Sequence, residues 1–177
     1  PDVVVVEYSV NDGNCRRSAE TLEGLVRQIL KQPNLPAAVL LFMMSDSKHG
    51  TNAQEWHSKI GKHYGLPMIS FRDALWPEVQ QGRLPWEDII VDTVHPNDRG
   101  HAYAADFVIR YLEQVHEKMT GELPISPLPK ALLTTEHEFT VMMNAGSVVP
   151  LNAGALEMIG NAGWQVLEKS RHGPAWA

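Results

Sequence analysis

Short apolar runs alternate with amphipathic segments over the first 120 residues, and this alternation is the strongest constraint on the fold. The β-branched run at residues 3–6 is typical of a strand that is buried on both faces of a parallel sheet. The pattern predicts further strands at 39–44 and 68–71, and helices at about 18–30, 52–64 and 100–119. Three strands joined by two helices indicate a parallel sheet with right-handed crossovers, and therefore an α/β fold.

The segment from residue 73 to residue 87 lacks a clean period, and we expect a surface loop there. Its Trp76 and Trp86 could form a lid over a substrate or pack against the core, and the sequence alone leaves both open. The short run 89–91 is expected to carry residues 92–95 to the same end of the sheet as the other loops. In the last helix, five apolar residues are expected to face inward: Ala104, Ala105, Val108, Ile109 and Leu112.

Composition excludes several classes of partner. The chain has 177 residues, a net charge of −6 and no basic run longer than Arg16-Arg17, so we expect no nucleic-acid or anionic-membrane surface. The longest apolar stretch, residues 37–44, is far shorter than the roughly 20 residues that span a bilayer. The single cysteine, Cys15, excludes an internal disulfide and a Cys-rich zinc site, and we interpret it as a free loop residue.

Two polar clusters are expected at the carboxyl end of the sheet, where ligands bind in open α/β folds. The first contains Ser9, Asn11 and Asp12, and the second contains Asp92 and His95. An imidazole titrates near neutrality and suits a general base, and a carboxylate on its other nitrogen fixes its tautomer and orientation. The alternatives are structural: an ion pair that closes the loop at 92–95, and a turn-forming role for Asn11.

The two clusters resemble motifs of the SGNH hydrolases, also called the GDSL esterase/lipase family. Residues 5–12 read Val-Val-Glu-Tyr-Ser-Val-Asn-Asp, and residues 92–97 read Asp-Thr-Val-His-Pro-Asn. The resemblance implies a three-layer α/β/α, flavodoxin-like domain. It also implies that Asn11 donates to an oxyanion hole and that Asp92 and His95 belong to a Ser-His-Asp triad. Ser9 stands where the family usually has glycine, and we expect Ser9 and Asp12 to support the loop near the site.

The family's nucleophile block, Gly-Asp-Ser, has no counterpart in this sequence, and no Gly-x-Ser-x-Gly motif occurs either. Ser45 and Ser47 lie in no recognisable nucleophile context. We therefore expect a fragment of a longer hydrolase, with its nucleophile in an upstream segment. The alternatives are a naturally degenerate enzyme, or a non-catalytic carbohydrate-binding or assembly protein that keeps the fold.

A metal site is the rival interpretation of the same residues. Asp98 and His101 repeat the spacing of the 92–95 pair, and His49, His57 and His63 add further imidazoles. No set of them has an established ligand pattern, so we expect no metal and no cofactor. Asp98 is expected to cap the last helix, and His101 to pack in its first turn.

Beyond the domain expected at residues 1–120, the chain changes character. Residues 121–130 contain three prolines and are interpreted as a linker. Residues 131–177 are expected to form a partial β accessory region, with strand-like runs at 138–143, 147–151 and 163–167. At the other end, the chain begins inside a predicted strand without a signal-peptide pattern, so any targeting signal is expected upstream.

The resemblance to the SGNH hydrolases, together with the missing nucleophile block, predicts an esterase fragment. The complete enzyme is expected to hydrolyse short acyl esters, and the accessory β region and the aromatic loop at 73–87 favour acetyl groups on carbohydrate. A long-chain lipase should present an extended apolar surface, whereas the loop at 73–87 mixes acidic and basic residues with its aromatics.

Overall fold

A computed structural model describes residues 1–119, 121, 127–140, 166–167 and 175–176. The chain divides into two compact units, Pro1–Phe139 and Thr140–Ala177, which are treated separately below. In the described part of the chain, no helix is both long enough and apolar enough to cross a membrane.

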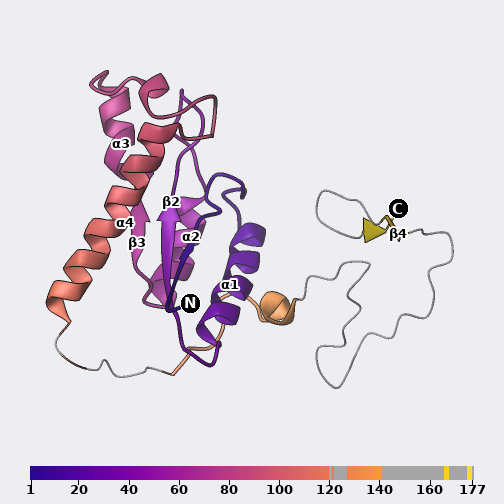
Figure 1. Ribbon diagram of the computed structural model, residues 1–177. Coiled ribbons are helices and arrows are strands. Elements are labelled where there is room, and N and C mark those ends of the chain that lie inside the picture. The colour runs from indigo at the N-terminus through magenta and orange to yellow at the C-terminus, as the bar shows by residue number, and fades with distance from the viewer. Residues whose placement is uncertain (120, 122–126, 141–165, 168–174, 177) are drawn as a thin grey trace. The chain divides into compact units, whose positions relative to one another are not determined.

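Three parallel strands form the sheet of the first unit, as the sequence predicted (Figure 1). They are β1 (Val3–Val6), β2 (Ala37–Phe42) and β3 (Met68–Ser70), in the order β1-β2-β3. Val3 pairs with Ala37 and Leu40 pairs with Met68. Because all three strands run the same way, the loops that follow them emerge at one end of the sheet.

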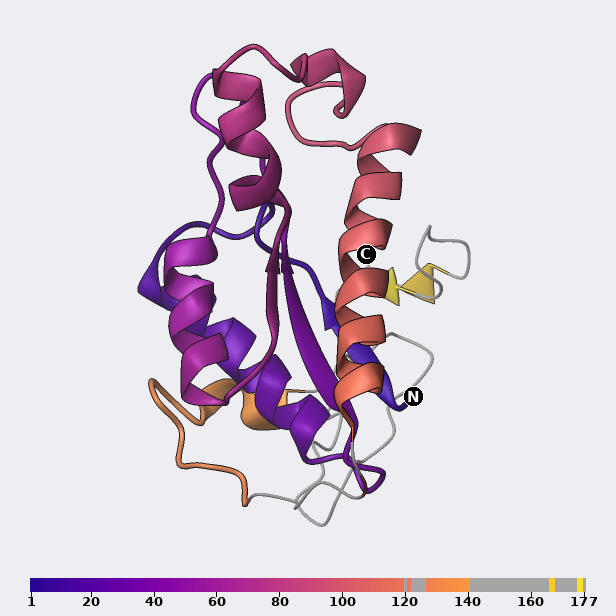
Figure 2. The same cartoon turned by 90° about the vertical axis from the view of Figure 1, so that its left-hand side faces the viewer.

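Helices cover both faces of this sheet, which gives the expected three layers. The helices α1 (Arg16–Leu30) and α2 (Gln54–His63) lie on one face, and α4 (Asp98–Lys118) lies on the other (Figure 2). The helix α3 (Phe71–Gln80) follows β3 directly and packs against α4, with the rings of Phe71 and Phe107 6.3 Å apart.

Two apolar cores correspond to the two faces. The core between the sheet and α1 and α2 consists of Val6, Ala19, Leu22, Val26, Ala38, Leu40, Phe42, Ile60 and Leu66. The core on the side of α3 and α4 consists of Met43, Met44, Phe71, Leu75, Leu84, Ile89, Ile90 and Ala104. The alternation of side chains along β2 therefore supplies both cores, as expected for a central strand.

The prediction of a loop at 73–87 is wrong over most of that range. Residues up to Gln80 belong to α3, and Trp86–Asp88 form the 3-10 helix η1. Ser70 caps α3, since its hydroxyl oxygen accepts a hydrogen bond from the amide of Asp73. The buried face of α3 repeats at Phe71 and Leu75, but Pro77 interrupts the helical pattern and hid it from the sequence analysis.

The start and the face of α4 also differ from expectation. Asn97, not Asp98, caps the helix, accepting a hydrogen bond from the amide of Gly100 at 3.0 Å. Of the five apolar residues expected to face inward, only Ala104 is buried, whereas Ile109 and Leu112 are 53% and 37% exposed. Among the described residues, α4 contributes to the core through Tyr103, Ala104 and Phe107, so its buried face is offset from the predicted one.

The first unit extends past the boundary expected at residue 120. Buried Glu23 on α1 accepts hydrogen bonds from the amides of Leu132, Leu133 and Thr134, so this segment packs on α1. The 3-10 helix η2 (Glu136–Phe139) follows it and also contacts α1.

The strand-like runs predicted for the tail are described only in part. The predicted run at 138–143 begins in η2, not in a strand, and its residues 141–143 lie outside the described residues, as does the run at 147–151. In the second unit, β4 (Val166–Leu167) pairs antiparallel with β5 (Ala175–Trp176). A two-stranded β element therefore occurs where the accessory β region was expected.

Candidate active site

The loops that follow β1 and β2 meet the loop at 92–95 at the carboxyl end of the sheet. The amide of Asp46, after β2, donates to the carbonyl of Thr93 at 2.8 Å. The amide of Ala53, at the start of α2, donates to the carbonyl of Ser9 at 2.8 Å. These contacts bring together the two polar clusters found in the sequence.

Asp92 and His95 form a hydrogen-bonded pair. Nδ1 of His95 lies 2.7 Å from Oδ2 of Asp92, and the amides of Val94 and His95 donate to Oδ1 at 2.8 and 2.9 Å. The amide and the ring of His95, with the amide of Val94, hold the pKa of Asp92 well below its usual range. Asp92 therefore stays ionised, and Nε2 of His95 is left for another partner.

The backbone around this pair is fixed on both sides. The amide of Val91 donates to the carbonyl of His95 at 2.8 Å, which closes the loop. Gly100 lets α4 begin directly against Ile89, because a Cβ atom at Gly100 would lie 2.1 Å from the carbonyl oxygen of Ile89. The indole of Trp86 donates to the carbonyl of Asp92 at 2.9 Å. Trp86 thus supports the loop that carries Asp92 and His95, a pair referred to below as the dyad.

The loop after β1 places Asn11 in a tight turn. The amides of Asn11 and Asp12 both donate to the carbonyl of Tyr8, at 3.2 and 2.9 Å. Ser9 is fully buried beneath this turn, and its amide and hydroxyl both donate to Oε1 of Glu7, at 2.8 and 2.6 Å. A small residue is needed at Ser9 because the turn packs directly on Met43 and Ala53.

Asp12 extends from the same turn to α2. Its Oδ2 lies 3.0 Å from Nε2 of His57, a contact that is close but poorly aligned as a hydrogen bond. His57 is only 2% exposed. Burial lowers the pKa of His57, and the negative charges of Asp12 and Glu7 only partly oppose that effect. The turn that carries Asn11 is therefore joined to α2 by a side-chain pair in which His57 is buried and Asp12 is partly exposed.

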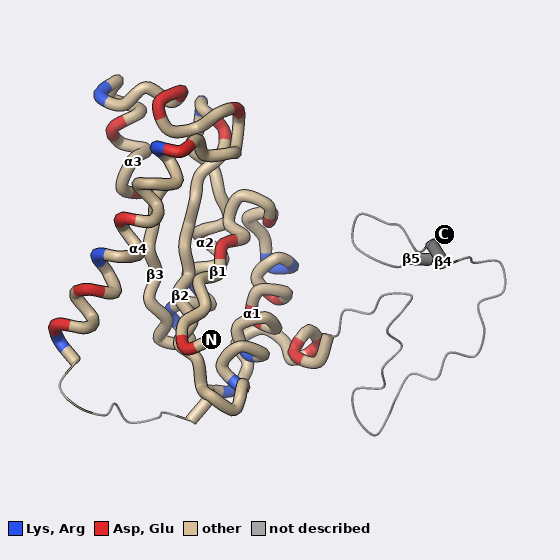
Figure 3. Tube along the Cα trace, viewed as in Figure 1, with Lys and Arg blue, Asp and Glu red and all other residues tan. Residues whose placement is uncertain are grey.

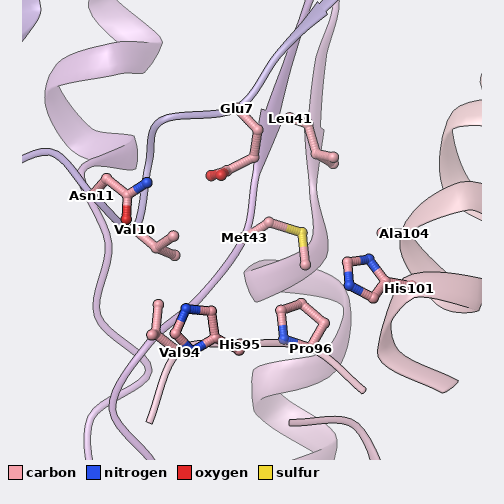
Figure 4. A pocket seen from close by; sticks show the side chains of 10 residues that line it. All are labelled: Glu7, Val10, Asn11, Leu41, Met43, Val94, His95, Pro96, His101 and Ala104. Atoms are coloured by element: carbon pink, nitrogen blue, oxygen red, sulfur yellow. The ribbon is translucent and has the colours of Figure 1, made fainter. Parts of the chain in front are cut away.

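Asn11 and His95 line one pocket of about 360 Å³ (Figure 4). Its walls come from the loop after β1, the end of β2, the 92–97 loop and the first turns of α4. They are formed by Glu7, Val10, Asn11, Leu41, Met43, Val94, His95, Pro96, His101 and Ala104. Among the expected site residues, Asn11 and His95 face the pocket, while Ser9 and Asp12 hold the loop behind it.

The sequence analysis missed two polar residues of this pocket. Glu7 follows directly on β1, and its position at the end of a strand was the signal that could have revealed it. His101 was expected to pack in the first turn of α4, but it is exposed and lines the pocket. The side chains of a helix tilt toward its N-terminus, which directs His101 back to the loop of His95.

The pocket contains no serine among the described residues that line it. The hydroxyl of Ser45 instead interacts with Thr51 inside its own loop. Among the described residues, no group of three or more His, Cys, Asp or Glu side chains is placed to hold a metal ion. His49 contacts Asp46, and His63 contacts the carbonyl of Lys130.

Charge on the helices that flank the sheet is mixed. Figure 3 shows acidic and basic residues interspersed along α1 and α4. Arg99, for example, pairs with Asp88, and Arg110 pairs with Asp106.

The fold agrees with the comparisons to known proteins. Residues 1–103 match the GDSL-like lipase/acylhydrolase family, and the chain belongs to that family. Two similar solved structures are crystal structures of a two-domain esterase (CEX) active on acetylated mannans, the second co-crystallised with mannopentaose.

The first structure is 34% identical with a TM-score of 0.77, and the alignment covers 83% of this chain and 39% of that one. The second is 38% identical with a TM-score of 0.64, covering 74% and 35%. This chain therefore spans less than two fifths of each of these two chains. No curated protein matches it.

Proposed function

We propose that this chain carries the base, its orienting carboxylate and an oxyanion donor of a serine esterase that removes acetyl groups from carbohydrate. The single observation that carries the proposal is that Asn11 and His95 line one pocket, with Asp92 bonded to the far nitrogen of His95. The nucleophilic serine is supplied by a part of the enzyme outside this chain.

The geometry supports an acyl-transfer cycle. Nε2 of His95 takes the proton of the serine hydroxyl while the serine oxygen attacks the ester carbonyl, and Asp92 stabilises the resulting imidazolium. The side-chain amide of Asn11 donates to the oxyanion. As the tetrahedral intermediate collapses, the alcohol leaves with the proton from His95. Water then repeats the sequence on the acyl-enzyme and releases the acid, so no cofactor is needed.

Preference for a short acyl group is supported by the pocket itself. A volume of about 360 Å³ is near the lower end of the range for ligand pockets, and polar side chains of Glu7, Asn11, His95 and His101 share its walls with the apolar ones. A long acyl chain would require an extended apolar channel. The similar solved structures belong to an esterase active on acetylated mannans.

The division into two compact units supports the proposed domain organisation. Residues 1–120 supply part of the catalytic domain, and the compact unit to which they belong continues through the segment docked on Glu23 to Phe139. We place the accessory β region within Thr140–Ala177, where β4 and β5 pair.

Hydrolysis of an acetyl ester and a dodecanoyl ester by the complete enzyme, the polypeptide of the whole reading frame, tests this proposal. We expect faster turnover of the acetyl ester, and a preference for the dodecanoyl ester would refute the short-acyl assignment. The 177-residue chain alone is expected to be inactive. If the 177-residue chain did turn over an ester, if His95→Ala abolished that turnover and if a covalent serine probe labelled a residue within the chain, then the nucleophile would lie within this chain and our assignment would be wrong.

A non-catalytic carbohydrate-binding protein is the second candidate, because no serine lines the described pocket. The two candidates differ in the complete reading frame. A Gly-Asp-Ser block upstream of residue 1 supports the esterase, whereas its absence together with retained sugar binding supports the binding protein.

A further inference from the structure

A second cavity, of about 390 Å³, lies between the loop after β2 and helix α3. Its lining residues are His49, Gly50, Arg72, Asp73, Trp76 and Pro77. None of them lines the pocket of Asn11 and His95. The acyl-transfer cycle described above therefore leaves this cavity without a role.

The loop that forms one wall is tied to the catalytic loop. Ser45 and Thr51 pair across the loop, and the amide of Asp46 donates to the carbonyl of Thr93. Asp46 has a φ of 67°, in the left-handed region that residues other than glycine rarely adopt. Such strain persists only where the surroundings hold it, here through bonds from the amides of His49 and Gly50 to the carbonyl of Asp46.

The opposite wall is tied to the same catalytic loop through tryptophans. Gly50 sits directly on the indole of Trp76, because a Cβ atom there would lie 2.3 Å from the ring. Trp76 meets Trp86 edge to face at 6.4 Å, and Trp86 donates to the carbonyl of Asp92. Both walls of the cavity are thus joined to the loop that carries the dyad.

The charged groups of the cavity are already paired, which favours an uncharged ligand. Nη2 of Arg72 lies 2.9 Å from Asp73, and Nδ1 of His49 lies 2.6 Å from Asp46. Each potential cation therefore has its own carboxylate, and a phosphate or carboxylate ligand would have to displace one. A neutral ligand rich in hydroxyl groups can bond to these fixed donors and acceptors and contact the indole of Trp76.

We propose that this cavity is a sugar subsite, which holds a ring of the carbohydrate whose acyl ester is cleaved beside His95. In that respect the inference rests on the proposed function, since the sugar is the alcohol part of the substrate. Asp46 holds the ring of His49 and Asn52 holds Arg72 at 3.0 Å, while the side chain of His49 is 68% exposed, so both groups are fixed in place and the ring of His49 is open to a sugar. The subsite would set where along a glycan the acyl group is removed.

Surface plasmon resonance on the immobilised complete enzyme, with mannopentaose and inorganic phosphate as soluble probes, tests the subsite independently of catalysis, because neither probe carries an ester. We expect mannopentaose to bind and phosphate not to compete. His49→Ala and Arg72→Gln should each weaken binding about tenfold, as loss of one or two hydrogen bonds does. Arg110→Gln, which removes a similar exposed pair on α4, is the matched control and should bind as the unsubstituted protein does.

A second measurement separates this inference from the proposed function. In the complete enzyme, the two variants should lower kcat/KM on an acetylated mannooligosaccharide about tenfold more than on phenyl acetate, which has no sugar. An equal loss on both substrates, undiminished mannopentaose binding, or competition by phosphate would overturn the subsite. Binding of mannopentaose that weakens in both variants, with no hydrolysis of either ester, would keep the subsite and refute the esterase. Thermal unfolding of each variant verifies that it is folded.

Discussion

Oδ2 of Asp12 lies 3.0 Å from Nε2 of His57, and this contact joins the turn of Asn11 to the buried side of α2. The amide of Ala53 reinforces the junction through the carbonyl of Ser9. The position of Asn11, the oxyanion donor in our proposal, is therefore tied to His57, a side chain that the catalytic motifs do not contain. This relationship leads to a prediction about pH.

Stability should fall as the pH is lowered through the range in which histidine titrates. Because burial lowers the pKa of His57 in the folded state, the unfolded chain takes up a proton first, near its ordinary value of 6.5. The contribution of neutral His57 is thus complete above pH 6.5 and is lost as the pH falls toward the folded pKa. Urea unfolding between pH 7.5 and 5.5 should show this loss in the unsubstituted protein and a flatter profile in His57→Gln. Identical profiles would show that protonation of His57 does not cause the loss of stability.

Glu23 provides a second stability prediction. Burial by itself raises the pKa of Glu23, but the hydrogen bonds from Tyr64, Leu132, Thr134 and Leu133 outweigh it, and the net pKa is lowered. Its stabilisation is therefore present above pH 4.5 and lost as the pH falls through the folded pKa. Glu23→Gln should cost about 2 kcal/mol in the free energy of unfolding at pH 7.

Glu20→Gln is the matched control for that variant, because Glu20 makes an exposed i,i+4 pair with Arg16. Its cost should be about 0.5 kcal/mol or less. If Glu23→Gln proved as mild as Glu20→Gln, the segment at 132–134 would not depend on α1 for its position.

Gly100 should tolerate no side chain. In Gly100→Ala the added Cβ atom would collide with the carbonyl oxygen of Ile89, so the start of α4 must move away from the 92–97 loop. We expect a loss of about 1–3 kcal/mol of stability, typical of overpacking, together with reduced activity of the complete enzyme. Gly82 has a positive φ but free space around it. Gly82→Ala should therefore cost about 1 kcal/mol of stability without affecting activity. Equal activities in the two variants would argue against the Gly100 contact.

The 177-residue chain should self-associate. Within the described residues β1 pairs only with β2, and on its uncovered face Val3 and Val5 are 42% and 43% exposed. Unpaired strand edges beside apolar side chains promote association. Sedimentation velocity should show oligomers of the unsubstituted chain. The double variant Val3→Lys/Val5→Lys should be monomeric. Val91 is also exposed but lies outside the sheet, so Val91→Lys should still form oligomers. A monomeric unsubstituted chain would contradict this expectation.

Local patterns explain what could be predicted from the sequence. Asp92 and His95 are three residues apart in one loop, so their pairing needs no knowledge of the rest of the chain. The meeting of their loop with Asn11 followed from strand–helix alternation, which dictates a parallel sheet with its loops at one end.

The features that were missed depend on contacts between distant segments. Glu23 looks like an ordinary solvent-facing helix residue until the segment at 132–134 is docked on it. His57 and Glu7 gain their roles only when α2 and the end of β1 enclose the turn of Asn11. The helix α3 escaped detection for a different reason, since Pro77 broke a pattern that the buried residues of α3 would otherwise have revealed.

The most direct test of the pocket is the kcat/KM of the complete enzyme for an acetyl ester, measured for single substitutions of its polar residues. His95→Ala and Asp92→Asn should each lose several orders of magnitude, and Asn11→Ala about 3 kcal/mol of transition-state stabilisation, or roughly a hundredfold. His101→Ala, at the pocket wall but outside the dyad, should lose no more than about tenfold. If instead His101→Ala were as inactive as His95→Ala, or Asn11→Ala were fully active, the assignment of His95 and Asn11 as base and oxyanion donor would be contradicted.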